Sequence, residues 1–258
     1  MISDMELLFY ILGFTFLGSI ASLIGGVALL SNKHIAGKIS HYLYSYAAGV
    51  LLGTAFFDLL PEAQAEAGEI NIFLWTLVGI LSFFLLVRFL HWFHHHDAHF
   101  KGEHQQTIPL IIVGDTVHNF IDGVGITASF LVSIPLGILT TVAVAVHEIP
   151  QEIGDFAILL RKGLSRARVL WINVLSASAS FAGAVLMFML GDYLEGSLPI
   201  FLSVTAGFFI YIASSDLIPE IHKQDNQKVA FVESMLLIIG ALSVLVVASL
   251  IESFGLHV

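Results

Sequence analysis

Long apolar stretches dominate this 258-residue sequence and constrain its fold more than any other feature. Eight of them reach about 20 residues, the length that an α-helix needs to cross the hydrocarbon core of a bilayer. They cover approximately residues 7–30, 42–60, 70–90, 108–131, 136–160, 169–190, 198–218 and 229–251. Hydrophobic residues make up 57% of the chain and the mean hydropathy is +0.91, which excludes an ordinary water-soluble domain.

The apolar stretches are continuous, and this favours membrane helices over the short alternating strands of a β-barrel. We therefore predict an all-α membrane protein with eight transmembrane helices. Residues 1–258 are expected to form one transmembrane domain. Its parts are helices 1–3 (about 7–90), a cytoplasmic loop (about 91–106), helices 4–5 (about 107–160) and helices 6–8 (about 169–251).

The positively charged residues predict the orientation, because short loops rich in Lys and Arg stay on the cytoplasmic side. All ten lie at the same predicted side of the bilayer, at Lys33, Lys38, Arg88, Lys101, Arg161, Lys162, Arg166, Arg168, Lys223 and Lys228. The loops on the opposite side carry Asp and Glu without Lys or Arg. Both termini are therefore expected to lie outside.

Charge and cysteine content exclude several functions. No nucleic-acid partner is expected, and the net charge of −10 says more about an outer face that attracts cations. The chain has no cysteine, so neither a disulfide nor a thiolate metal site can form. The expected partners are divalent metal ions and the lipid bilayer.

Two predicted helices carry ionisable residues at their middle. In the string GDTVHNFIDG, Asp115, His118, Asn119 and Asp122 lie at positions i, i+3, i+4 and i+7, so they share one helix face. In the string HEIPQEIGD of the next helix, the corresponding residues are His147, Glu148, Gln151, Glu152 and Asp155. Both faces have the composition of metal-ligand faces.

These two helices contain five carboxylates and no Lys or Arg at their middle. A charged side chain at the centre of a membrane helix costs about 2.5–3.5 kcal/mol on the insertion scale, so it needs a partner. A divalent cation neutralises this excess of negative charge. Nitrogen and carboxylate ligands without sulfur suit zinc, iron(II) or manganese. Pro150 removes a backbone hydrogen bond and frees the carbonyl of Val146 near this site.

A histidine-rich tract occupies the predicted loop between helices 3 and 4. Its members are His91, His94, His95, His96, His99 and His104. Neutral imidazoles bind divalent metals, so the tract is a candidate cytoplasmic metal loop. A solvated loop without a metal role is the alternative, because the loose spacing specifies no ligand geometry.

An internal repeat relates residues 47–63 to residues 205–221 at an offset of 158. It pairs Asp58 with Asp216 and Glu62 with Glu220, and His222 follows the second copy. The same offset relates helix 1 to helix 6 and helix 3 to helix 8. Because five crossings separate the partners, the copies are inverted, and the fold is predicted to be a 3+2+3 inverted-repeat bundle with a midplane substrate site.

The repeat also predicts a transport mechanism. We expect alternating access, with the two three-helix repeats rocking against helices 4 and 5. Asp58 and Glu62 are expected at the outer end of one helix, and Asp216 and Glu220 at the inner end of its partner. There they would capture a cation and release it.

The strings HNFIDG and HEIPQEIGDFAILLRKG, with LLPEA in helix 2 and DLIPE in helix 7, resemble the signature segments of the ZIP (Zrt/Irt-like protein) family of divalent metal transporters. The resemblance covers the whole chain. It implies eight helices in a 3+2+3 arrangement, often dimeric, and movement of Zn²⁺ and related ions such as Cd²⁺, Fe²⁺ and Mn²⁺ into the cytoplasm. It also implies one ion at His118, Asp122, His147 and Gln151, and a second at Asn119, Glu148 and Glu152.

This sequence departs from the family pattern at two places. Many relatives have histidine where this chain has Gln151. Some bacterial relatives have a carboxylate in the stretch of helix 6 where this chain has Ser176, Ser178 and Ser180. We therefore expect one strong metal site and one accessory site. A bacterial inner membrane is the expected location.

Two other function classes compete with a transporter. HEIPQ resembles the HExxH motif of an intramembrane metalloprotease, but Gln151 stands where the second histidine is required. A metal-gated channel or a metal sensor is the other alternative. The sequence favours the transporter and predicts neither an enzyme nor a bound cofactor.

Overall fold

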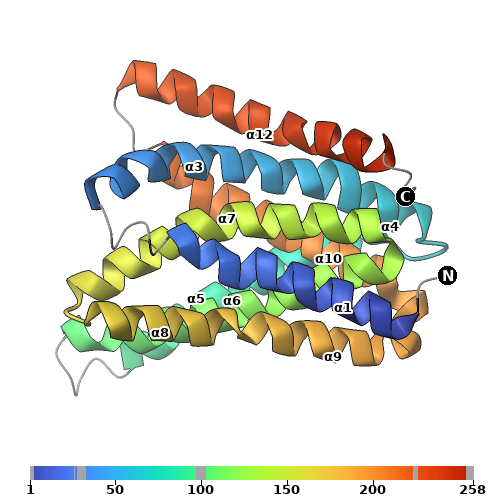
Figure 1. Cartoon of the computed structure of the whole chain (residues 1–258), viewed down its shortest axis with the longest axis horizontal. Coiled ribbons are helices and arrows are strands. Elements are labelled where there is room, and N and C mark those ends of the chain that lie inside the picture. The colour runs from blue at the N-terminus through green and yellow to red at the C-terminus, as the bar shows by residue number, and fades with distance from the viewer. Residues whose placement is uncertain (1–2, 26, 28–32, 97–102, 223–225, 254–258) are drawn as a thin grey trace.

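The computed structural model describes residues 3–25, 27, 33–96, 103–222 and 226–253. Within these residues the chain forms helices and short turns, with no strand. The helices are α1 (Asp4–Thr15), α3 (Lys33–Thr54), α4 (Leu60–Ala65), α5 (Ile72–His96), α6 (Glu103–Val132), α7 (Ile134–Arg161), α8 (Arg166–Ala177), α9 (Ala179–Leu194), α10 (Leu198–Tyr211), α11 (Ile218–Ile221) and α12 (Gln227–Ser253). Because α3 runs on into α4, α8 into α9 and α10 into α11, the described chain contains eight helical segments, as predicted (Figure 1).

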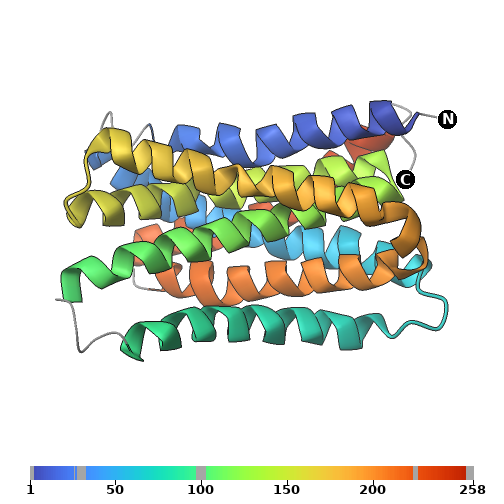
Figure 2. The same cartoon turned by 90° about the horizontal axis from the view of Figure 1, so that it is seen from below.

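Six of these segments are long and apolar enough to cross a membrane by length and composition. The other two predicted spans are α1 and α6. After Thr15, α1 continues as a π-helical turn (Phe16–Ile20) and a 3₁₀ turn (Ala21–Leu23), and the middle of α6 carries the polar residues of the predicted metal site. Both lie lengthwise beside the other helices (Figure 2). The described chain is therefore that of an integral membrane protein, and α12 exposes large apolar residues such as Phe231 and Leu242 along its length.

Serine and glycine set several helix ends. The Ser133 hydroxyl accepts a hydrogen bond from the backbone N–H of Leu136 at 3.3 Å, and Pro135 occupies the first turn, so the turn between α6 and α7 is tight. Gly163 has a φ of 89°, which ends α7 in the left-handed conformation that glycine adopts without strain. Ser133 and Pro135 thus define the start of α7, and Gly163 defines its end.

The helices on either side of the predicted loop at residues 91–106 extend into it. The described part of this range is helical, since α5 continues to His96 and α6 begins at Glu103. Neither Gly nor Pro interrupts the tract from Leu90 to His96, and histidine does not break a helix. Glu62, which is expected at the outer end of its helix, lies in α4, the short helix that follows α3.

A π-helical turn at Ala55–Leu59 explains how the helix continues through Pro61. The N–H of Leu60 bonds to the carbonyl of Ala55, five residues back, and the wider turn accommodates the proline ring. The same device precedes Pro219, where Ile212–Leu217 is π-helical and the N–H of Ile218 bonds to Ala213 O. The two turns are thus related by the 158-residue offset of the sequence repeat.

Close helix contacts follow the same offset. Gly49 on α3 packs against the backbone of α12 at Leu237, and a β-carbon at Gly49 would collide with the carbonyl oxygen of Leu237. Gly207 on α10 packs in the same way against α5 at Thr76 and Gly79. Adding 158 to Gly49 and Gly79 gives Gly207 and Leu237, so the α3–α12 contact has a counterpart in α10–α5. Small residues allow this close approach in membranes.

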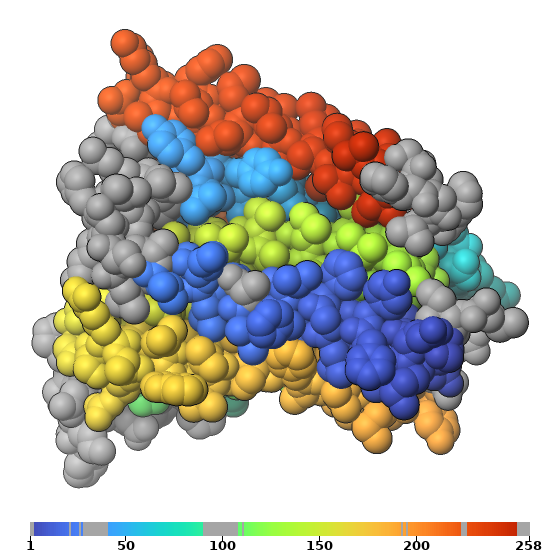
Figure 3. All heavy atoms as spheres, in the orientation of Figure 1, coloured from blue at the N-terminus to red at the C-terminus, as the bar shows by residue number. Residues whose placement is uncertain are grey.

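The helices pack into two groups. One consists of α3, α5, α10 and α12, in which α3 packs on α12 and α5 on α10. The other consists of α1, α6, α7, α8 and α9, in which α6 packs on α9 and α7, and α1 on α6, α7 and α9. On one face of the molecule, side chains of α7 lie between those of α3 and α1 (Figure 3). The contact of α3 with α7 is the largest between the groups.

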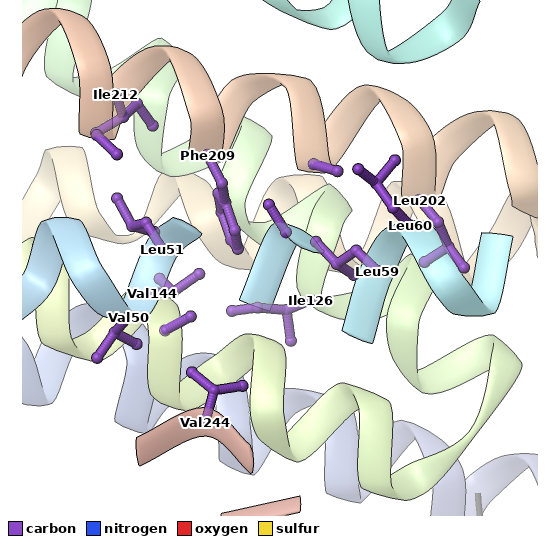
Figure 4. Packing of buried hydrophobic residues seen from close by; sticks show 14 of the residues in the cluster. Val50, Leu51, Leu59, Leu60, Ile126, Val144, Leu202, Phe209, Ile212 and Val244 are labelled. Atoms are coloured by element: carbon purple, nitrogen blue, oxygen red, sulfur yellow. The ribbon is translucent and has the colours of Figure 1, made fainter. Parts of the chain in front are cut away.

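An apolar core fills the middle of the bundle on one side of the predicted metal residues. It contains Leu51, Leu59, Leu202 and Phe209 with Ile126 of α6 and Val144 of α7, all buried (Figure 4). Ile126 lies one turn beyond Asp122, and Val144 lies one turn before His147. The core therefore closes the space next to the metal residues in this direction.

Candidate metal site

Four of the predicted metal residues meet between α6 and α7. His118 and Asp122 come from α6, His147 and Glu148 come from α7, and all four are buried. One ligand atom from each residue lies within 4.8 Å of the other three. The i, i+4 spacing of His118 and Asp122 directs both side chains to the same face of α6.

The distances between these atoms match the edges of a small coordination polyhedron. His118 Nε2 lies 3.2 Å from His147 Nε2, 3.4 Å from Asp122 Oδ2 and 3.2 Å from Glu148 Oε1. His147 Nε2 lies 3.6 Å from each of the same two oxygens. Zinc bonds of about 2.0–2.2 Å in a tetrahedral site place ligand atoms roughly 3.3–3.6 Å apart. The five separations that involve a histidine nitrogen are therefore close to those of a zinc site.

A backbone hydrogen bond orients the His147 ring. Its Nδ1 lies 3.0 Å from the carbonyl oxygen of Ala143, which can only accept, so Nδ1 carries the hydrogen and donates it. In the neutral ring Nε2 then keeps its lone pair and faces the cluster. Such a second bond at the far ring nitrogen is usual for metal-binding histidines.

Buried carboxylate oxygens without donors surround the cluster. Asp122 Oδ2 and both oxygens of Glu148 and Glu152 receive no hydrogen bond. The 3.2 Å approach of His118 Nε2 to Glu148 Oε1 is an ion pair only when the imidazole is protonated. Buried charges without partners are costly, and a divalent cation between the carboxylates and the neutral imidazoles would remove this cost.

The remaining predicted ligands lie beside the cluster. Asn119 is fully buried and donates to Asp115, and Glu152 is 1% exposed. Gln151 lines a cavity of about 520 Å³ that reaches His118 from one end of the bundle. Asp115, Asp155, Asp216 and Glu220 line the same cavity, and no Lys or Arg is among its described lining residues.

Asp58 and Glu62 lie away from this cluster and from the large cavity. They line a separate cavity of about 320 Å³ together with Ser249 of α12. Asp58 Oδ2 is buried there and has no hydrogen-bond partner. His222 is exposed at the end of α11.

The histidine tract is only partly described. His91, His94, His95 and His96 lie in the last turns of α5, and His104 lies in the first turn of α6. His99 lies outside the described residues.

Two residues near the site were not predicted from the sequence. The Tyr44 hydroxyl of α3 donates to the carbonyl of Pro150 at 3.3 Å and lines the large cavity. The Phe83 ring of α5 meets the His118 ring edge-on, with centroids 5.8 Å apart. Neither residue belongs to a local pattern, because each reaches the site only through packing between distant helices.

An all-helical membrane protein with a buried pair of histidines and a pair of carboxylates belongs to the class of metal-handling membrane proteins. The family model described as ZIP Zinc transporter matches residues 6–109 and 107–248. The chain belongs to the ZIP zinc transporter family.

Individual relatives carry the same name. The chain is 34% identical to zinc transporter ZIP13 of Pongo abelii over 224 residues, which cover 81% of this chain and 66% of that protein. It is 30% identical to ZIP13 of Mus musculus over 87% of this chain and 74% of that protein. It is 42% identical to ZIP10 of Danio rerio over 46% of this chain and 14% of that protein. The chain thus spans about two thirds of the first relative and a small part of ZIP10.

The relatives decide two expectations. They are named zinc transporters, which are not enzymes, so the family membership argues against an intramembrane metalloprotease. They come from animals, so the expectation of a bacterial inner membrane receives no support.

Proposed function

We propose that this protein transports Zn²⁺ across the membrane into the cytoplasm, through a midplane site formed by α6 and α7. The observation that carries the proposal is the set of 3.2–3.6 Å separations among His118, Asp122, His147 and Glu148. Gln151 contributes a neutral side chain at the edge of this site. Asn119, Glu148 and Glu152 form the accessory site.

The direction of transport rests on the charge distribution. Arg161 and Arg166 flank the turn between α7 and α8, at the end of the bundle where α3 and α12 begin (Figure 1). Loops rich in Lys and Arg stay cytoplasmic, so this end faces the cytoplasm. The start of α1 and the end of α12 lie together at the opposite end, which faces outward (Figure 1).

The positions of the two cavities support the proposal of an inward-facing state. The large cavity reaches His118 from the end that we assign to the cytoplasm. On the other side, Ile126 and Val144 belong to the closed apolar core, and the cavity at Asp58 lies beyond it. Access from one side at a time is what alternating access requires. Asp58 and Glu62 attract the ion outside, and Asp155, Asp216, Glu220 and His222 lie on the release route.

The packing suggests which helices move together. The expected rocking of two three-helix repeats against α6 and α7 does not follow the packing groups, since α1, α8 and α9 pack on α6 and α7. We place the moving boundary between this group and α3, α5, α10 and α12. The related contacts at Gly49 and Gly207 support the inverted 3+2+3 repeat itself. The whole chain acts as one transmembrane domain, and a homodimer is consistent with the exposed apolar faces.

Uptake of radiolabelled zinc into proteoliposomes tests this proposal. We expect slow uptake that saturates with zinc and is reduced by competing Cd²⁺, Fe²⁺ or Mn²⁺ to different extents. Fast uptake that does not saturate would indicate a channel. A protein that binds zinc without any flux would indicate a sensor.

A further inference from the structure

Asn119 and Asp115 form a buried pair one turn apart on α6. Asn119 Nδ2 donates to Asp115 Oδ1 at 2.9 Å and to the Asp115 carbonyl oxygen at 3.1 Å. Asn119 is 0% exposed and Asp115 is 7% exposed. Asn119 Oδ1 is buried and receives no hydrogen bond from the part of the chain that the structure describes.

This arrangement determines which way the Asn119 amide faces. A side-chain amide can turn over and exchange its oxygen with its NH₂ group, and the NH₂ group repels a cation. An ionised carboxylate only accepts hydrogen bonds, and so does a carbonyl oxygen. Because both acceptors of Asp115 lie on one side of the amide, its two hydrogens turn towards Asp115 and Oδ1 turns away.

Asn119 Oδ1 is a buried acceptor that lacks a donor among the described residues. Leaving a buried acceptor without a donor costs free energy, and folded proteins rarely retain one without a function. Asn119 shares its helix face with His118 and Asp122, which belong to the metal cluster. A cation at this face would be the missing partner of Asn119 Oδ1.

We propose that Asp115 is a positioning residue that holds Asn119 with its oxygen available to the transported cation. Asp115 does not ligate the ion in the described state, since it is not among the four residues whose ligand atoms converge. The inference rests on the proposed function, because it assumes that a cation visits Asn119. It assigns to Asp115 a different role from that of a carboxylate on the release route.

A double-mutant cycle tests this role. Zinc affinity is measured by titration of the purified protein in detergent, and KM and the maximal rate are measured in proteoliposomes. Asp115→Ala is expected to weaken zinc binding and raise KM by about tenfold, as for other residues that orient metal ligands. Asn119→Ala is expected to have a similar effect. Asp115→Ala in the Asn119→Ala background is expected to change neither quantity further, because Asp115 then has no amide to orient.

A conservative variant separates orientation from charge. Asp115→Asn keeps a side-chain oxygen that accepts from Asn119 but removes the negative charge, so it is expected to retain most of the zinc affinity. An affinity as low as that of Asp115→Ala would overturn the proposal, because it would show that the charge itself attracts the ion. A further loss on adding Asp115→Ala to Asn119→Ala would also overturn it.

The failures of the two proposals are distinguishable. Absence of zinc uptake by the unaltered protein contradicts the proposed function, whatever the variants do. Normal uptake and zinc binding by the unaltered protein and by Asp115→Ala alike contradict only the positioning role. The melting temperature of each variant in detergent verifies folding, and Asp115→Asn keeps the test informative if Asp115→Ala does not fold.

Discussion

His118 Nε2 lies 3.2 Å from His147 Nε2, although the two residues are 29 positions apart and belong to different helices. Two lone pairs at this distance repel unless a proton or a cation lies between them. A cation held by both nitrogens contacts α6 and α7 at once, so both helices of the hairpin contribute to its binding. Asp122 and Glu148 then complete the coordination from the same two helices.

Replacement of Gln151 tests the edge of the metal site. Gln151 lies one turn after His147 and lines the large cavity that reaches His118. Gln151→His adds an imidazole, a stronger zinc ligand than a neutral amide, so we expect tighter zinc binding and a lower maximal transport rate. Zinc titration and uptake rates measure the two effects. Unchanged affinity and rate would show that position 151 does not approach the ion.

The histidine tract is predicted to act outside the transport route. Replacing His91, His94, His95, His96, His99 and His104 by serine is expected to leave the initial rate of zinc uptake nearly unchanged. A tract that receives or senses metal would change zinc accumulation at high zinc, and this is the outcome we expect. The assay compares initial rates and long-term zinc content in cells. A strong loss of the initial rate would place the tract on the route.

Cysteine labelling tests alternating access without background, because the chain has no cysteine. The repeat relates Ala55 to Ala213, but both residues are fully buried and unsuitable for labelling. Ser249 lines the cavity at Asp58, which we assign to the outer side, and Ile158 lines the large cavity at His118, which we assign to the cytoplasmic side. Conditions that favour the inward-facing state are expected to slow labelling of Ser249→Cys from outside and speed labelling of Ile158→Cys from inside. Rates that rise and fall together would favour a continuous pore.

Helix packing gives a stability prediction. A β-carbon at Gly207 would collide with the backbone of α5 at Thr76, and backbone cannot move aside as a side chain can. Gly207→Ala is therefore expected to destabilise the protein by about 1–3 kcal/mol. The matched control is Gly13→Ala, where nothing lies within 4 Å of the added carbon. The melting temperatures of Gly207→Ala and Gly13→Ala are measured in detergent. Equal values would show that the α5–α10 contact has room for the added carbon.

Local periodicity made the core of the site predictable. His118 and Asp122 share a face because they are four residues apart, and the absence of Lys and Arg indicated a cation. The sequence also predicted eight helical segments, because apolar length is the main requirement for crossing a bilayer.

Features that depend on packing between distant helices were not predictable. The contact of Tyr44 with Pro150 joins residues 106 positions apart. The continuation of α3 into α4 depends on a π-helical turn that no residue type signals. The packing of α1 on α6, α7 and α9 instead of on its own repeat also arises only in three dimensions.

We propose that His118, Asp122, His147 and Glu148 hold the transported ion. Measuring zinc uptake by the His147→Ala variant tests this site. Purified protein is reconstituted at equal amounts into proteoliposomes and supplied with radiolabelled zinc. His41→Ala is the control, because His41 lies on α3 and lines neither cavity. We expect uptake by His147→Ala to fall to the level of empty vesicles while uptake by His41→Ala stays close to that of the unaltered protein. Normal zinc uptake by His147→Ala would contradict the assigned site.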